Sequence, residues 1–184
     1  MKIVPNGFQT QRRHRRTEAV ILFSVSGQAF AIAAGAIDEI RSTDNFSSVS
    51  SELDVKSVAK VRHRLRRNRK WYYVVNACAH FDLPASRPTL VLVLRDSCVA
   101  VLVDEIDRIE TISRLMVLPQ SFSGPECMWY RGLTLIDDSV VPVLNPSGFL
   151  TESELTQLDA LNGASIPAQN EVAFRRSETQ GAIR

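Results

Sequence analysis

Val20–Ile32 (VILFSVSGQAFAI) and Leu90–Leu102 (LVLVLRDSCVAVL) decide the fold: each is an apolar run, a polar turn and a second apolar run, and they start seventy positions apart. A second pair of segments, Trp71–Asn76 (WYYVVN) and Val140–Asn145 (VVPVLN), repeats in the same order at nearly the same spacing. Unrelated segments that recur in order at one period indicate a duplicated unit. The sequence therefore predicts two similar β units side by side.

Strands are predicted wherever β-branched and aromatic residues cluster between turn residues. The first two strands, over 19–25 and 28–33, are joined by a tight turn at Ser26 and Gly27. Further strands are expected over 36–41, 71–76, 89–94, 98–112, 130–136 and 140–144. The longest apolar runs have too few polar interruptions to be half exposed, so we expect both of their faces to be buried. The Ser- and Asp-rich stretch 42–60 has no predicted structure.

Helix signals are few. Thr151 and Glu154 form a capping box that predicts a helix over 151–161, with Leu150, Leu155 and Leu158 on its buried side. A short helix is expected at Ala77–Leu83, before Pro84.

The predicted organisation is a mobile basic arm over 1–17, one domain over 18–162 and a disordered tail over 163–184. Within the domain, residues 18–88 form a first barrel unit, 89–150 a second, and 151–162 a closing helix. The fold class is mostly β, because strand-rich units with short turns lose their unpaired edges by closing into small barrels.

Charge is clustered although the net charge is only +2. One basic run covers Arg12–Arg16 and another covers Arg62–Lys70. Such a run suits an acidic protein partner or nucleic acid, and is most often a solvated surface. A basic small-barrel protein that binds nucleic acid is therefore the alternative function.

The sequence does not favour an enzyme. Its eight glycines form neither a P-loop nor a dinucleotide fingerprint, and its three histidines make no triad pattern. Cys78 and His80 are two possible metal ligands where a zinc site needs at least three, so neither metal nor cofactor is expected. The acidic run Asp104–Glu110 is interpreted as an exposed strand edge.

A cytoplasmic location is expected from the cysteines and the N-terminal sequence. Three cysteines make an odd set without a disulfide framework. The apolar run after Arg16 resembles a signal peptide, but Glu18 and the polar residues 24–28 interrupt it and its pattern recurs in the second unit. No stretch is apolar for long enough to cross a bilayer.

The succession of motifs along residues 18–150 resembles a CheW-type domain. The motifs are ILFSVSGQAFAI (21–32), IDEI (37–40), YYVVN with FDLP (72–84), TLVLVLRDSCVAVLVDEID (89–107) and RGLTLIDDSVVPVLNPSGFL (131–150). The resemblance implies two intertwined five-stranded barrels with an apolar groove between them. It also implies a non-catalytic chemotaxis adaptor, a scaffold in a two-component signal-transduction system that couples the cytoplasmic tips of chemoreceptors to the regulatory domain of a histidine kinase.

Partner-binding residues follow from the same resemblance. Ile37 and Glu39 match receptor-contacting positions, and Val99 and Val101 match a strand lining the groove. Each has a plainer reading, since apolar strand residues usually pack inward and Glu39 could simply face solvent.

The chain also departs from the family pattern. The Arg-Gly pair of the family falls at Asn68 and Arg69, so Arg67 or Arg69 is a candidate substitute for the absent arginine. Asn76 replaces a family aspartate, and both Asn76 and Asn145 could instead bind local backbone at turns. These departures imply a divergent adaptor, in which the basic run Arg62–Lys70 meets an acidic receptor or kinase surface.

Overall fold

The computed structural model describes residues 17–44, 50–53 and 57–164. The predicted arm up to residue 16 and the predicted tail from residue 165 lie outside these residues. The elements in chain order are β1 Glu18–Val25, β2 Gln28–Ala33, η1 Ala34–Ala36, β3 Ile37–Ser42, β4 Ser50–Glu52, β5 Val61–Arg67, β6 Lys70–Asn76, α2 Ala77–His80, β7 Leu90–Leu94, β8 Val99–Val103, β9 Glu105–Ile112, η2 Pro125–Trp129, β10 Tyr130–Ile136, β11 Ser139–Leu144, η3 Pro146–Gly148 and α3 Glu152–Ala164.

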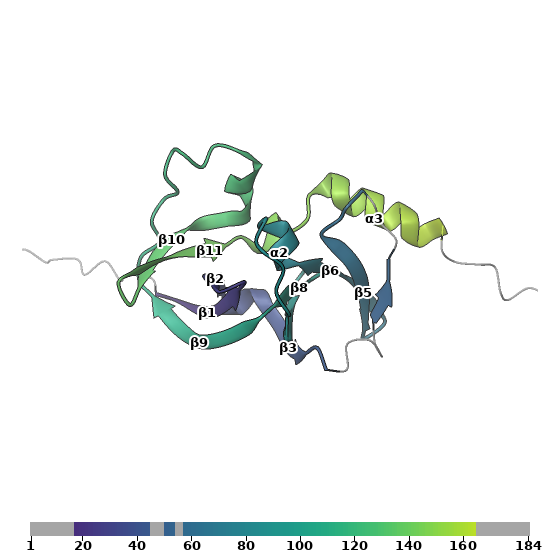
Figure 1. Ribbon diagram of the computed structural model, residues 1–184, viewed down its shortest axis with the longest axis horizontal. Coiled ribbons are helices and arrows are strands. Elements are labelled where there is room, and N and C mark those ends of the chain that lie inside the picture. Colours follow the sequence, from purple (N-terminus) through teal and green to yellow (C-terminus); the bar gives the residue numbers. More distant parts are fainter. Residues whose placement is uncertain (1–16, 45–49, 54–56, 165–184) are drawn as a thin grey trace, which may run out of the picture.

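Two sheets lie side by side, with α2 between them and α3 running along the second (Figure 1). The first sheet has five strands in the order β10-β11-β2-β1-β9, and the second has six in the order β3-β7-β8-β6-β5-β4. The mostly β fold with a helix near its C-terminal end is confirmed. The second sheet gains a sixth strand because β4, within the stretch that had no predicted structure, pairs with β5.

Neither strand ladder closes on itself as a complete barrel. In the first sheet, Met116 and Leu133 form an isolated bridge with hydrogen bonds of 2.7 and 2.9 Å, which joins the segment after β9 to β10. The two units are therefore open, barrel-like sheets.

The strand orders show the duplication directly. The first sheet has the order β10-β11-β2-β1-β9, and five strands of the second have the matching order β5-β6-β8-β7-β3. The extra strand β4 lies on the outer side of β5. In both sheets a single parallel contact, β11 with β2 or β6 with β8, joins two antiparallel hairpins. The repeat seen in the sequence is thus a repeat of sheet topology.

The predicted division at residue 88 does not separate the sheets. The β1–β2 hairpin from the first repeat lies in the sheet of β9, β10 and β11, whereas the β7–β8 hairpin from the second repeat lies in the sheet of β3 to β6. Each repeat therefore donates one hairpin to the other sheet. The segments 18–88 and 89–150 are repeats in sequence, but neither forms a sheet of its own.

The exchanged hairpins are buried on both faces, as predicted from their apolar runs. In β1, Ile21 and Phe23 enter a central core between the sheets, while Val20 and Leu22 enter the core of the first sheet. In β7 and β8, alternate residues divide in the same way between the central core and the core of the second sheet. Burial of this apolar surface on both sides holds the two sheets together.

The predicted C-terminal helix is confirmed, and its capping box is formed. The Thr151 amide donates to Glu154 Oε2 at 2.8 Å and the Glu154 amide donates to Thr151 Oγ1 at 3.2 Å, which completes the capping box. Leu150 and Leu158 are buried and Leu155 packs against the same central core. The expected helix at Ala77–Leu83 is shorter, since α2 ends at His80.

Candidate partner-binding surfaces

The three apolar residues expected in a groove lie in the central core instead. Ile37 is 6% exposed, Val99 5% and Val101 1%. Ile37 opens β3, and Val99 and Val101 lie in β8, where they face the β1–β2 hairpin across the core. All three side chains are therefore core residues in the described structure, and their contact with a partner stays a prediction.

Glu39 and Arg67 are brought together, although 28 positions separate them in sequence (67 − 39). Arg67 Nη1 lies 2.6 Å from Glu39 Oε2 and 2.8 Å from Asp38 Oδ2. Glu39 Oε2 is buried and makes no directed hydrogen bond, and the carboxylate charge is compensated by Arg67 and by Arg41, whose Nε lies 3.7 Å from Glu39 Oε1. We call Asp38, Glu39 and Arg67 the second-sheet ion-pair cluster; it ties β3 to the end of β5.

Asn68 and Arg69 form the two-residue turn between β5 and β6. Their φ angles are 46° and 65°, the left-handed region that glycine adopts most easily. The family glycine that the resemblance places at Arg69 would therefore fit this backbone. Both side chains are exposed, and Arg67 is committed to β3, so Arg69 is the better placed of the two candidate substitutes to reach a partner.

A basic and aromatic surface on the same hairpin was not predicted as a unit. The Arg64 guanidinium carbon lies 4.4 Å from the centre of the Trp71 ring, and that of Arg66 lies 5.7 Å from it. Trp71 is 37% exposed. We call Arg64, Arg66 and Trp71 the Arg–Trp surface. Alternate arginines along a strand, with an aromatic residue opposite, were the sequence signal for it.

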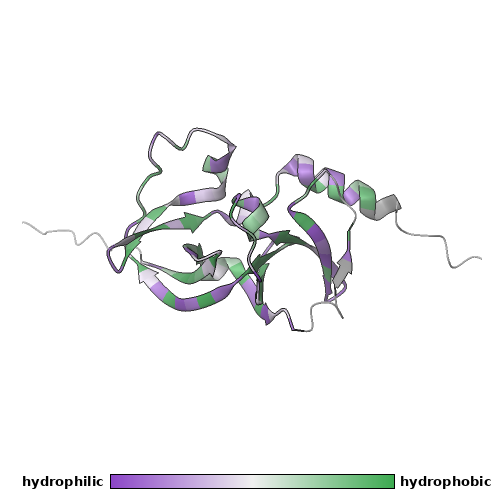
Figure 2. Ribbon diagram, in the orientation of Figure 1, coloured by the Kyte–Doolittle hydropathy of each residue, from purple (hydrophilic) through white to green (hydrophobic). Residues whose placement is uncertain are grey.

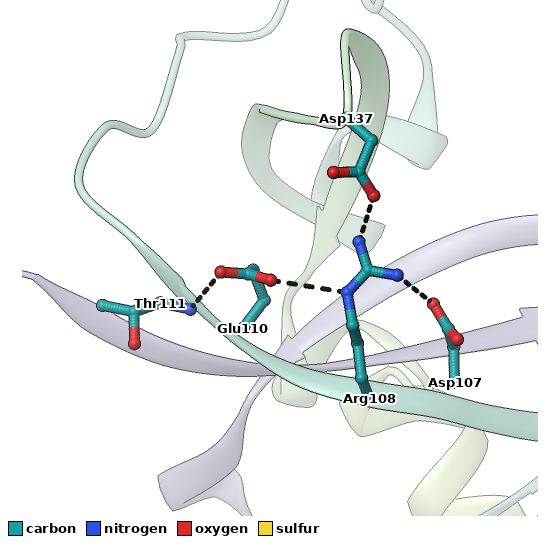
Figure 3. Close-up of polar contacts among 5 residues, drawn as sticks. All are labelled: Asp107, Arg108, Glu110, Thr111 and Asp137. Carbon is teal, nitrogen blue, oxygen red and sulfur yellow. Dashed lines mark hydrogen bonds and ion pairs between the residues drawn. The ribbon is translucent and has the colours of Figure 1, made fainter.

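The corresponding hairpin of the first sheet carries acidic residues at its turn. Figure 3 shows Arg108 of β9 held by Asp107 and Glu110 from its own strand and by Asp137 from the β10–β11 turn. The Asp107 and Glu110 contacts are 2.7 and 3.4 Å. Asp137, followed by Glu110 and Asp107, raises the pKa of the Arg108 guanidinium. We call Arg108, Asp107, Glu110 and Asp137 the first-sheet ion-pair cluster.

Exposed apolar side chains gather on the first sheet. Leu135 and Val140 are cross-strand partners in the β10–β11 hairpin and are 61% and 59% exposed. Along β9, hydrophilic and hydrophobic residues alternate, as Figure 2 shows, and Ile109 is among the exposed apolar ones. β9 is thus an edge strand, as predicted for the acidic run, and its outer surface is partly apolar. The prediction is wrong for Asp104, which precedes β9 and accepts hydrogen bonds from the Ser26 amide and the Ser86 hydroxyl.

His80 is a buried ring packed among aromatic side chains. It lies against Trp129, Phe81 and Phe149 at centroid distances of 4.5, 4.7 and 5.2 Å, while Lys60 Nζ lies 3.4 Å from its Nδ1. Burial and the charge of Lys60 lower the pKa of His80 to about 3, so the ring is neutral. Within the described residues, no three His, Cys, Asp or Glu side chains are grouped to hold a metal ion. All three cysteines are free thiols, and burial raises the pKa of Cys98.

Asn76 and Asn145 act locally. The Asn76 side chain accepts from the Ala79 amide at 3.3 Å, and Asn145 accepts from the Ser147 amide at 3.2 Å. Each caps the short helix that follows its strand, which confirms the backbone-binding reading of both residues.

The sequence and the fold were compared with those of known proteins. A family model described as the CheW-like domain matches residues 19–154, which is most of the chain. The chain belongs to the CheW-like domain family. A search of curated proteins finds no match.

A solved structure supports the same fold. The CheW-like chain is similar to the scaffolding protein TtCheW from Thermoanaerobacter tengcongensis, with a TM-score of 0.59 and 11% sequence identity. The match covers 71% of this chain and 90% of that one. At this identity the likeness concerns the fold alone. In the described part of the chain, no helix has the length and apolar character needed to span a membrane.

Proposed function

We propose that this CheW-like chain is a non-catalytic chemosensory adaptor that couples chemoreceptors to a histidine kinase through protein contacts. Membership of the family over residues 19–154 carries this proposal. Its site of action would be the cytoplasmic side of the membrane, at the receptor tips.

The surfaces of the molecule support binding at more than one place. The first sheet offers the exposed pair Leu135 and Val140 beside acidic residues, while the second offers the basic β5–β6 hairpin. A protein that joins two partners needs two distinct surfaces, and apolar contacts with charged surroundings are typical of protein interfaces. The contacts with receptor and kinase are therefore expected on the outer hairpins and not at the buried Ile37, Val99 and Val101.

The test is reconstitution with the chemoreceptors and histidine kinase of the organism that makes this chain. Kinase autophosphorylation is measured with the purified chain, with receptor fragments in bilayer discs, and with both. An adaptor should raise receptor-dependent phosphorylation several-fold and sediment with the receptors. If the kinase is unaffected and neither partner sediments with the chain, the proposal is wrong; retention of nuclease-sensitive material instead would favour the nucleic-acid alternative.

A further inference from the structure

We propose that the surface on which α3 lies is a binding site for an amphipathic helix, and that α3 is its removable internal occupant. A partner helix that carries the contact residues of α3 would replace α3 there. The proposal goes beyond the adaptor function and does not rest on it, because it concerns contacts within this chain and the kind of helix that fits them.

The apolar contacts of α3 are few. Among its described side chains, Leu158 alone is buried, and Leu155 is half-buried. Both pack in the central core, which also contains Tyr73 of β6 and its strand partner Val99 of β8. One buried leucine is a small apolar contact for a helix of 13 residues. Helix α3 is therefore held less firmly than strands such as β7, in which four of five residues are buried.

Two polar contacts fix the position of α3 along the second sheet. Glu154 Oε1 lies 2.9 Å from Lys60 Nζ, and the Tyr73 hydroxyl donates to Asp159. The Lys60 and Glu154 side chains are 16% and 25% exposed, so water screens their attraction less than it would at an open surface. Together with the two leucines, these contacts define the pattern Glu-Leu-x-x-Leu-Asp over 154–159. We call the surface that receives this pattern, at Lys60, Tyr73 and the core beside them, the α3 seat.

A helix held in this way is able to leave without unfolding the rest of the domain. Figure 1 shows α3 along the outside of the second sheet, where no described element lies on its outer side. The buried residues Phe149 and Leu150 come before α3, so they stay in place when α3 leaves. A helix of this length is marginally stable alone in water, so α3 depends on its contacts with the seat. Opening at α3 thus costs much less free energy than global unfolding.

The α3 seat fits a helix better than an added strand or a nucleic acid. Strands β6 and β8 are both interior strands of the second sheet, so the seat lies on a sheet face and offers no free strand edge. Lys60 matches a single carboxylate and not a row of phosphates. Anchors at positions i, i+3 and i+4 of one helix face are typical of helix-in-groove binding, and α3 already presents them.

The experiment asks whether the α3 seat binds a second copy of the helix once the internal copy is displaced. The probe is a fluorescein-labelled peptide with the sequence of residues 151–164, and its binding to the full chain is followed by anisotropy. Leu158→Asp removes the buried anchor of the internal helix. Ala160→Asp is the matched control, because it adds the same charge to α3 at an exposed position. A scrambled peptide controls for composition, and thermal unfolding shows that each variant is folded.

We expect the Leu158→Asp variant to bind the peptide at least about tenfold more tightly than the unmodified chain or Ala160→Asp, because an intact internal α3 competes at a high effective concentration. Adding Lys60→Glu to the Leu158→Asp variant should weaken binding several-fold, and a peptide carrying Glu154→Lys should recover part of that loss. Equal binding to Leu158→Asp and Ala160→Asp, no binding to either, or equal binding of the scrambled peptide would overturn the proposal.

Hydrogen exchange of the unmodified chain, followed by NMR, decides the question if Leu158→Asp does not fold. Amides of α3 should exchange through local opening, with protection at least about 100-fold below that of the β7 amides. Equal protection of α3 and β7 would mean that the helix leaves only on global unfolding, and the proposal would then be wrong. Neither measurement uses a receptor or a kinase, so a failed reconstitution of the adaptor function leaves both results unchanged.

Discussion

The β5–β6 and β10–β11 hairpins occupy the same place in their two sheets, yet their surfaces have opposite character. Each joins its sheet through one parallel contact, turns through two residues with positive φ, and is followed by an asparagine-capped short helix. The first hairpin turns at Asn68 and Arg69 and is basic; the second turns at Asp137 and Asp138 and has an apolar outer pair. The duplicated architecture has been kept while the outer surfaces diverged.

The ion pairs follow the same contrast. In the second sheet, an arginine at the end of the hairpin strand meets acids on the edge strand β3; in the first sheet, an arginine on the edge strand β9 meets an acid at the hairpin turn. In both sheets an ion pair thus links the hairpin to the edge strand, but the arginine is on the hairpin in the second sheet and on the edge strand in the first. The two sheets therefore differ in the chemistry of their surfaces as well as in the extra strand β4 of the second sheet.

The comparison would be broken most severely by separating the repeats. Residues 18–88 expressed alone should lack cooperative unfolding, because β1 and β2 lose β9 and β11, and β6 loses β8. Circular dichroism and the dispersion of amide signals in NMR spectra would measure this. Mixing with residues 89–164 should restore structure; a folded, cooperative 18–88 fragment would show that each repeat can close its own sheet.

A matched pair on β3 tests which side chains are interior. Ile37 is 6% exposed and Ile40 is 42% exposed. Ile37→Glu should lower the free energy of unfolding by at least about 4 kcal/mol, because a carboxylate would be buried without a partner. Ile40→Glu should cost less than about 1 kcal/mol. Urea denaturation measures both, and similar losses would contradict the placement of Ile37 in the core.

His80 and Phe149 occupy equivalent places in the two repeats, because each lies four residues after the asparagine that caps its short helix, and their ring centroids are 5.2 Å apart. The pKa of His80 is lowered from 6.5 to about 3, so below pH 6.5 the unfolded chain binds a proton that the folded chain does not. Stability should therefore be greatest above pH 6.5 and fall as the pH is lowered toward 3. Between pH 7.5 and pH 5 we expect a loss of about 2 kcal/mol.

His80→Phe, which makes the first repeat like the second, should remove this pH dependence in urea denaturation. Burial opposes the ionisation of Glu154, but the Thr151 backbone and Lys60 outweigh it and lower the pKa of Glu154 below 4.5. The stabilising contribution of ionised Glu154 is therefore lost only below that pH, and it does not affect the change in stability between pH 7.5 and pH 5. An unchanged slope in the variant would assign the pH dependence to other groups.

The two ion-pair clusters should differ in strength. Arg67 is the less exposed arginine, at 24% against 39% for Arg108, and it compensates a buried oxygen of Glu39. Arg67→Gln should cost about 1 kcal/mol, and more in low salt than in high salt. Arg108→Gln should cost less. Thermal unfolding at two salt concentrations compares them, and a larger effect at Arg108 would reverse the ranking.

The smallest effect is expected at the turns. Arg69 has a φ of 65° and Asp138 a φ of 61°. Arg69→Gly should raise the free energy of unfolding by up to about 1 kcal/mol, because glycine adopts this conformation without a steric penalty. Asp138→Gly should gain less, since aspartate tolerates the left-handed region better. A loss of stability in Arg69→Gly would mean that the arginine side chain makes a stabilising contact.

Most strands could be predicted from the sequence because apolar alternation and turn residues act locally. The basic strand β5 was missed, since only Val61 and Leu65 carry its buried face. The exchange of hairpins does not follow from the residue pattern, because β1–β2 and β7–β8 have the same pattern and either would fit either sheet; the resemblance to the CheW family alone implied intertwined units. Because the two hairpins are copies of one pattern, the sequence does not show which hairpin joins which sheet.

The candidate site was harder to predict for two physical reasons. Val99 and Val101 lie in a strand buried on nearly all positions, and Ile37 starts an edge strand in which buried and exposed residues alternate. In neither setting does an apolar residue type separate a groove from a core. The partner of Arg67 depends on how β3 meets β5, which no local signal specifies. The Arg–Trp surface, in contrast, follows from strand alternation once β5 is known to be a strand.

The exchanged hairpins have a consequence for synthesis on the ribosome. Strand β2 is complete at Ala33, but its neighbour β11 ends at Leu144, 111 residues later (144 − 33). At about 5 to 20 residues per second, that interval lasts roughly 6 to 22 seconds. Until it ends, the face of the nascent β1–β2 hairpin that carries Val20, Leu22 and Ala31 lacks its core partners from β11, Val141 and Val143. This segment is thus where the emerging polypeptide most needs protection by a chaperone.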